Sequence, residues 1–95
     1  MKKVHMVVTT TCSVCKMLKP MIDKVIGSSK CELVIEYADS DAVTPVICDL
    51  LTEMNIKSVP AFFFMQGTKL VSTHFGAISM PDLKKKVTEL ENYVG

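Results

Sequence analysis

The spacing of apolar residues along the chain changes several times, and each change marks a predicted element. The apolar run at residues 3–9 predicts a strand buried on both faces, and residues 32–38 predict a second strand. Between them, from about Cys12 to Gly27, apolar residues recur at helical spacing, with Pro20 inside the segment. The apolar positions of this predicted helix are Val14, Met17, Leu18, Met21, Ile22, Val25 and Ile26.

The second half of the chain predicts a helix, a hairpin and a last helix. Pro45 suits the first turn of a helix that runs to about Asn55, with Thr44 or Asp41 as its cap. Strands at 61–65 and 70–75 are joined by a turn around Gly67. A final helix opens at 79–82, where Ser79 is the expected N-cap, and continues through Leu83, Val87, Leu90 and Val94.

The resulting order is β-α-β-α-β-β-α, which predicts an α/β fold. The first two strands flank a helix and should be parallel with a right-handed crossover, whereas the last two form an antiparallel hairpin. We therefore expect a mixed four-stranded sheet flanked by helices, built as a single domain from residues 1–95.

Composition excludes several classes of function. Eleven basic and ten acidic residues give a net charge near +1, which argues against binding to nucleic acid or to an anionic membrane. The apolar runs are too short to cross a bilayer, and the N-terminal residues lack the apolar core of a signal peptide. Four cysteines are too few for a secreted disulfide scaffold. We expect a cytoplasmic monomer.

The segment TTTCSVCK, residues 9–16, carries the candidate chemistry. Cys12 should lie where the first strand ends and the first helix begins, the edge at which open α/β sheets place their sites. The N-terminus of a helix favours an anion, so it favours the thiolate of Cys12, whereas Cys15 lies one turn further in. This asymmetry predicts that Cys12 attacks a substrate disulfide and that Cys15 resolves the mixed disulfide.

A metal site and an inert disulfide are weaker interpretations of the same pair. Zinc sites with four cysteines usually contain two close pairs, but Cys31 and Cys48 stand alone in the sequence. His5 and His74 have no partner at ligand spacing. We therefore expect no metal and no cofactor, and we interpret Cys31 and Cys48 as small buried apolar residues.

Two longer motifs resemble those of the thioredoxin family. CSVCK followed by Pro20 is similar to the family's active-site helix, and SVPAFFFMQGTKLVSTHFGA is similar to its second conserved segment. The resemblance covers nearly the whole chain from residue 3. It implies the thioredoxin fold and a protein-disulfide reductase that receives electrons from a reductase of the thioredoxin-reductase type.

The resemblance also implies roles for four residues outside the cysteine pair. Pro60 would be a cis-proline beside the cysteines, although an ordinary proline at a strand start is also permitted. The backbone of Val59 would pair with a bound substrate chain, as an added strand does. Gly76 and Ala77 would line the same docking surface.

The chain departs from the family pattern near the cysteines. Thr11 stands where thioredoxins usually have Trp, and Ser13-Val14 replaces the usual Gly-Pro. Met6 falls where many members keep a buried Asp that helps to deprotonate the second cysteine. Glu36 is a candidate substitute, but we expect a solvated carboxylate there because Glu is rarely buried.

Two further functions remain open. Glutaredoxins share the short fold and would use glutathione, although their usual CPYC and Gly-Gly-Asp motifs are not present. The chain is also compatible with a non-catalytic module that binds a metal or a partner. The electron donor that reduces the oxidised form distinguishes a glutaredoxin-like enzyme from a thioredoxin-like one. Metal analysis of protein purified under reducing conditions distinguishes the metal-binding module from both enzymes.

Overall fold

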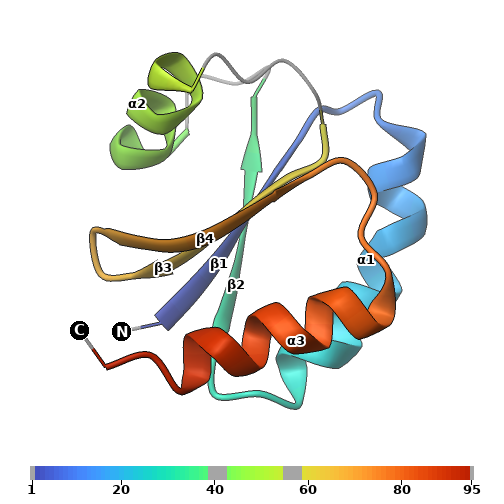
Figure 1. The fold of residues 1–95 in the computed structure, drawn as a ribbon. Coiled ribbons are helices and arrows are strands. Elements are labelled where there is room, and N and C mark those ends of the chain that lie inside the picture. The colour runs from blue at the N-terminus through green and yellow to red at the C-terminus, as the bar shows by residue number, and fades with distance from the viewer. Residues whose placement is uncertain (1, 39–42, 55–58, 95) are drawn as a thin grey trace.

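The structure, a computed structural model, describes residues 2–38, 43–54 and 59–94. The elements follow the predicted order and are drawn in Figure 1. Their bounds are β1 (Lys2–Val8), α1 (Ser13–Gly27), β2 (Glu32–Tyr37), α2 (Pro45–Glu53), β3 (Ala61–Gln66), β4 (Lys69–Phe75) and α3 (Met80–Glu91). Asn55, the expected end of α2, and Asp41, one of its two expected caps, lie outside the described residues.

The sheet is mixed, as predicted, with strand order β2-β1-β3-β4. The central strand β1 runs parallel to β2, with Val7 opposite Glu36, and antiparallel to β3, with Val7 opposite Ala61. β3 and β4 form the antiparallel hairpin, and Gly67 takes a positive φ of 61° in its turn. The carboxyl ends of β1 and β2 therefore meet the start of β3 at one edge of the sheet.

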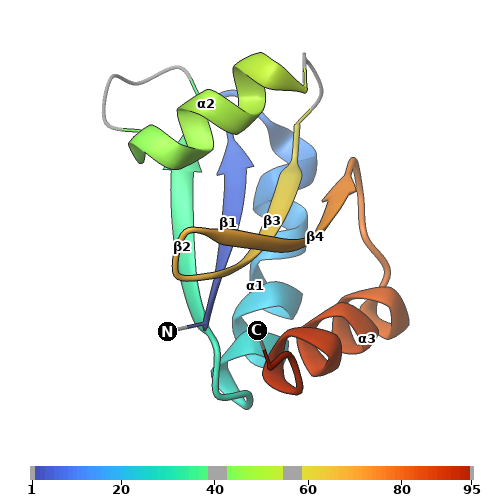
Figure 2. The ribbon, with the colours of Figure 1, turned by 60° about the vertical axis from the view of Figure 1, so that its left-hand side comes forward.

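Helices cover both faces of the sheet. α1 and α3 lie on one face and α2 lies on the other, as Figures 1 and 2 show from two sides. Consecutive residues of a strand point to opposite faces, so Phe62 and Phe64 fill the larger core under α1 and α3, and Phe63 fills the smaller core under α2. All three phenylalanines are fully buried, as their position in a central strand predicts.

The first turns of α1 differ from the prediction. Val14 and Met17 were expected on the buried stripe, but their side chains are 43% and 79% exposed. Met17 lies about 200° around the helix axis from Cys15, which faces the sheet, so it points away from the core. α1 therefore presents apolar side chains to solvent beside the cysteine pair.

The helix ends follow ordinary capping chemistry. Ser79 is the N-cap of α3, and its Oγ accepts a hydrogen bond from the backbone N–H of Asp82 at 3.3 Å, as the sequence predicts. Thr44 is the N-cap of α2, without a capping bond from its side chain. Within the described ranges, no helix has the length and apolar character needed to cross a membrane.

Candidate active site

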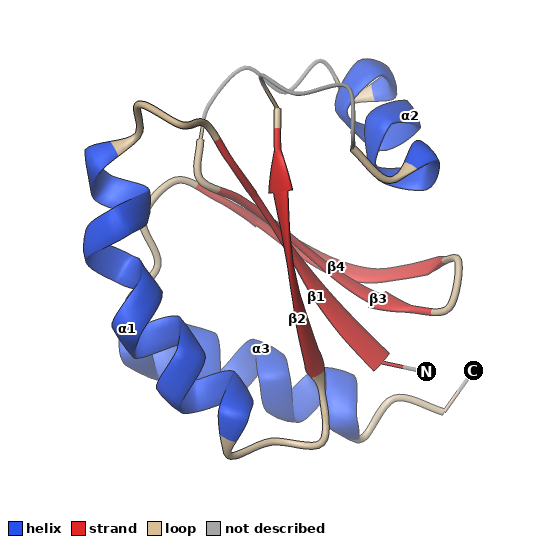
Figure 3. Cartoon of the chain, turned by 180° about the vertical axis from the view of Figure 1, so that it is seen from behind, coloured by secondary structure: helices blue, strands red, loops and turns tan. Residues whose placement is uncertain are grey.

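The cysteine pair lies at the junction of β1 and α1, which Figure 3 shows from behind. Cys12 and Cys15 are joined by a disulfide, with 5.3 Å between their Cα atoms. Cys12 is the N-cap of α1, and its Sγ accepts a hydrogen bond from the backbone N–H of Cys15 at 3.2 Å. Cys12 is half-buried, whereas Cys15 is only 5% exposed. The two sulfurs are therefore unequal in access to solvent.

Two local backbone hydrogen bonds hold this junction. The N–H of Cys12 donates to the carbonyl of Thr9 at 3.2 Å, which closes the turn after β1. The carbonyl of Cys12 then accepts the N–H of Lys16 at 3.4 Å, which starts the helix. The Cys12 sulfur thus accepts one N–H group of the first turn of α1, where the helix dipole favours negative charge.

The sheet register brings together residues that lie far apart in sequence. Pro60 precedes Ala61, which lies between Val7 of β1 and Phe75 of β4. The peptide bond between Val59 and Pro60 is cis, and the carbonyl of Pro60 accepts the N–H of Gly76 at 2.7 Å. The four predicted docking residues are thus grouped at the sheet edge where β1 ends.

A side-chain hydrogen bond that the sequence did not predict stabilises the turn at Gly76-Ala77. His74 Nε2 lies 2.9 Å from the carbonyl oxygen of Ala77, a distance at which the ring N–H donates to it. Gly76 has a φ of 87°, a conformation that a residue with a Cβ adopts only with strain. His74 stands in a strand pattern, and no sequence rule indicates a contact across the following turn.

A cavity of about 190 Å³ opens beside the recessed cysteine. Met6 and Val8 form its buried floor together with Cys15, and Met6 itself is fully buried. The remaining lining residues come from the loop after β1, from α1 and from β2, and are Thr9, Thr10, Lys16, Lys19, Ile35 and Tyr37. Lys19 also forms an ion pair with Asp23 at 2.9 Å.

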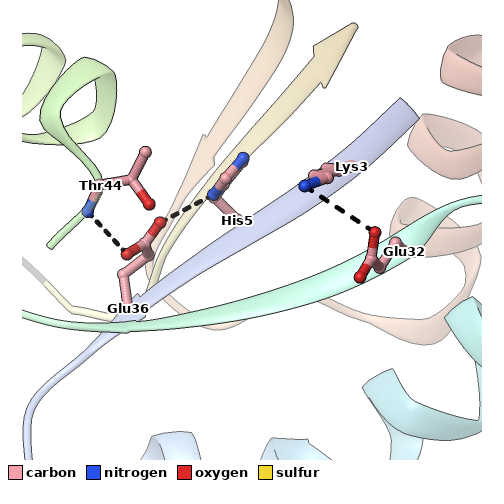
Figure 4. A network of polar contacts seen from close by, with 5 residues as sticks. All are labelled: Lys3, His5, Glu32, Glu36 and Thr44. Atoms are coloured by element: carbon pink, nitrogen blue, oxygen red, sulfur yellow. Dashed lines mark hydrogen bonds and ion pairs between the residues drawn. The ribbon is translucent and has the colours of Figure 1, made fainter. Parts of the chain in front are cut away.

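Glu36 corrects one expectation from the sequence. Its side chain is 3% exposed and is not a solvated carboxylate. Glu36 Oε2 lies 2.8 Å from His5 Nδ1, and Oε1 accepts the backbone N–H of Thr44 at 3.0 Å, as Figure 4 shows. The exposed ion pair of Lys3 and Glu32 lies further along the same two strands.

Glu36 lies on the opposite face of the sheet from Cys15. It pairs in register with Val7, whose side chain belongs to the core under α2, whereas Met6 and Ile35 pack in the core under α1. Glu36 therefore does not lie where it could act as a base for Cys15.

The pKa of the Glu36 carboxyl is below its ordinary value. Burial raises this pKa, but hydrogen bonds from the side chain and backbone of Thr44, a hydrogen bond from His5 and the charge of His5 together lower it by more. The carboxylate is thus the favoured form at neutral pH.

The other two cysteines differ from each other. Cys31 is buried under α1, as predicted, and burial raises the pKa of its thiol. Cys48 is exposed on α2, so its interpretation as a buried apolar residue is wrong. Among the described residues, no group of three or more His, Cys, Asp and Glu side chains is placed to hold a metal ion.

Comparison with known proteins assigns the fold. The family model described as Thioredoxin matches residues 2–89. A mutant thioredoxin from Halobacterium salinarum NRC-1 is similar over 99% of this chain and 78% of its own, with a TM-score of 0.78 and 15% identity. Mitochondrial thioredoxin 3 from Saccharomyces cerevisiae is similar over 93% and 77%, with a TM-score of 0.73 and 24% identity. A search of curated proteins finds no match.

Proposed function

Because the chain belongs to the thioredoxin family, we propose that it reduces disulfide bonds of other proteins through Cys12 and Cys15. The family fold together with the cysteine pair supports a thiol–disulfide oxidoreductase in general. The observation that carries the specific proposal is the unequal exposure of the two sulfurs, with Cys12 at the helix N-terminus and Cys15 recessed.

In this proposal the Cys12 thiolate attacks one sulfur of a substrate disulfide. The substrate disulfide breaks, a mixed disulfide forms at Cys12, and the first substrate thiolate leaves. Cys15 then attacks the Cys12 sulfur, which releases the second substrate thiolate and leaves the Cys12–Cys15 disulfide. A reductase of the thioredoxin-reductase type restores the dithiol. The reaction moves two electrons, and no cofactor is needed in this chain.

The proposed substrate is an extended chain that binds beside Cys12. Val59 and Pro60 precede β3, and Gly76 and Ala77 follow β4, so these residues lie at the end of the sheet where β1 leads into the cysteine pair. Val14, Met17 and Phe75 are exposed apolar side chains on the adjoining elements. We propose that a substrate strand pairs with Val59 and packs on Pro60, Gly76 and Ala77. We further propose a monomer that works in the cytoplasm, where thiols remain reduced.

Reduction of insulin by the dithiol form tests the proposal. Wild type should accelerate insulin reduction, and Cys12→Ser should reduce the rate to the uncatalysed background because the nucleophile is lost. Cys15→Ser should accumulate mixed disulfides through Cys12, which mass spectrometry detects. A wild-type rate equal to that of Cys12→Ser contradicts the proposal.

The electron donor decides between the two redox alternatives. Restoration of the dithiol by a flavoenzyme reductase supports the thioredoxin-type proposal, and restoration by glutathione alone supports a glutaredoxin-like enzyme. Stoichiometric zinc in protein purified under reducing conditions supports a metal-binding module in place of either enzyme.

A further inference from the structure

The cavity that Cys15 lines is the first feature of the proposal, because it opens beside this recessed cysteine. Its floor is buried and includes Cys15, whereas its outer lining is exposed. The exposed lining residues are Thr10, Lys16, Lys19 and Tyr37. Cys12 does not line this cavity. The cavity therefore lies on the side of the dithiol that holds the resolving cysteine, Cys15.

The resolving step needs a base at this position. The thiol of Cys15 must lose its proton before it attacks, because the thiolate is the nucleophile. The residues that line the cavity include neither a carboxylate nor an imidazole. The one carboxylate that is buried among the described residues, Glu36, lies across the sheet with His5 and Thr44.

We propose that this cavity is the proton exit of Cys15, and that the base is a solvent species. Hydroxide, or a small neutral base such as imidazole, enters the cavity and removes the proton. This inference rests on the proposed function, since it describes the second step of that reaction.

Apart from the base, this step needs no further oxidant or reductant. The base takes the proton from Cys15 Sγ, and the sulfur electron pair forms a bond to Cys12 Sγ. The bond between Cys12 Sγ and the substrate sulfur breaks, and the substrate leaves as a thiolate that takes a proton from solvent. The protein dithiol is oxidised to a disulfide, and the substrate disulfide is reduced.

The cavity suits this role in size and in charge. Its volume of about 190 Å³ is enough for several water molecules. The hydroxyl-bearing residues Thr9 and Tyr37 provide polar groups in its lining. Lys16 and Lys19 line the outer part. The Lys19 ammonium is paired with Asp23 at 2.9 Å, so Lys16 carries the positive charge that favours the thiolate over the thiol as the proton leaves.

A single-turnover experiment separates the two steps. Reduced protein is mixed with an aromatic disulfide whose released thiolate is coloured, in a Cys48→Ser background because Cys48 is exposed. The first release reports attack by Cys12, and the second reports resolution by Cys15. With pH and ionic strength fixed, imidazole should accelerate the second release by about threefold and leave the first unchanged.

Closing the cavity supplies the matched test. Ile35→Phe places a larger side chain in the lining and should slow the second release by about tenfold and remove its dependence on imidazole. Val34→Phe is the control, because Val34 precedes Ile35 on β2 and lines a different cavity of about 320 Å³. This control should retain both the rate and the imidazole dependence. Circular dichroism checks that each variant folds.

Three results would overturn the inference. The first is a second release in wild type that does not respond to imidazole, a test that needs no variant. The second is an unchanged imidazole dependence in folded Ile35→Phe. The third is a tenfold slower second release in Asp39→Asn or Asp41→Asn. These aspartates follow β2 in sequence and lie outside the described residues, and this result would show that a carboxylate of the protein is the base, in place of a solvent species. Loss of the first release contradicts the proposed function instead.

Discussion

On the face of the sheet under α2, the buried carboxylate of Glu36 contacts His5 and the backbone of Thr44, whereas on the face under α1 the sulfur of Cys15 lies among apolar side chains. Both groups are almost inaccessible to solvent. The first has polar partners that stabilise its charged form, and the second has a cavity through which solvent can reach it. Two groups that are equally buried can therefore have very different surroundings, one with polar partners and one with a cavity beside it.

The strongest way to break this contrast is to place a carboxylate on the apolar face. Met6→Asp buries a carboxyl group at a fully buried position beside the cavity. Desolvation should raise its folded-state pKa by about 3 units, which corresponds to a loss of about 4 kcal/mol in unfolding free energy at pH 7. Because the folded pKa lies above the unfolded value of about 3.9, this loss should shrink as pH falls towards 4.

Urea denaturation of the oxidised protein at pH 7 and at pH 4 measures this effect. Met6→Leu is the control, since it keeps the volume and should cost about 1 kcal/mol or less at both pH values. The new carboxylate should also make the second release independent of imidazole. Equal destabilisation of Met6→Asp at the two pH values would contradict the contrast between the faces.

Removing the charge of Glu36, on the face under α2, should also destabilise the protein most near neutral pH, but here because a favourable charge is lost and not because an unfavourable one is buried. Glu36→Gln loses hydrogen bonds to a charged acceptor and should lower the unfolding free energy by about 2 kcal/mol at pH 7. In wild type the folded pKa of Glu36 is lowered, so its contribution is present above the unfolded pKa of about 4.3 and is lost as pH falls through the folded value.

The difference between wild type and Glu36→Gln should therefore be largest near neutral pH and should disappear in acid. Glu32→Gln is the matched control on the same strand, because its exposed pair with Lys3 at 3.9 Å should contribute about 0.5 kcal/mol or less. A constant difference across the acid range would show that Glu36 acts through packing and not through its charge.

The two free cysteines, Cys31 and Cys48, test the described burial with the smallest expected change in stability. Cys48 is exposed on α2 and should react with iodoacetamide in the native dithiol protein, whereas Cys31 is buried, with a raised pKa, and should react only after unfolding. Cys48→Ser should change the unfolding free energy by about 0.5 kcal/mol or less. Mass spectrometry of the alkylated native protein locates the label, and labelling of Cys31 at the rate of Cys48 would contradict the described burial.

Much of the fold could be predicted because the local pattern and the tertiary structure agree. The run of apolar residues in β1 is buried on both faces as expected, since helices cover both sides of this central strand. The helix around Pro20 follows its apolar spacing, and Cys12 lies at its start. The cysteine pair could be placed because a strand followed by a helix fixes which cysteine is at the helix N-terminus.

The errors arise where burial depends on contacts distant in sequence. Glu36 was expected in solvent because its partner His5 lies 31 residues away and becomes a neighbour only through the register of β1 and β2. Met17 was expected on the apolar stripe of the first helix, and Cys48 was interpreted as a small buried apolar residue, but both side chains are exposed. Helical spacing identifies an apolar face, but it does not fix how much of that face the neighbouring elements cover.

The hydrogen bond from the Gly76 N–H to the Pro60 carbonyl has a consequence for the cost of substrate binding. At 2.7 Å it continues the pairing of β3 with β4 one residue beyond the pair formed by Ala61, the first residue of β3, and Phe75, the last residue of β4. The side chain of His74, on β4, also forms a hydrogen bond with the carbonyl of Ala77, the residue after Gly76. A substrate that binds there as proposed meets a preorganised surface, so the conformational entropy lost on binding comes mainly from the substrate chain.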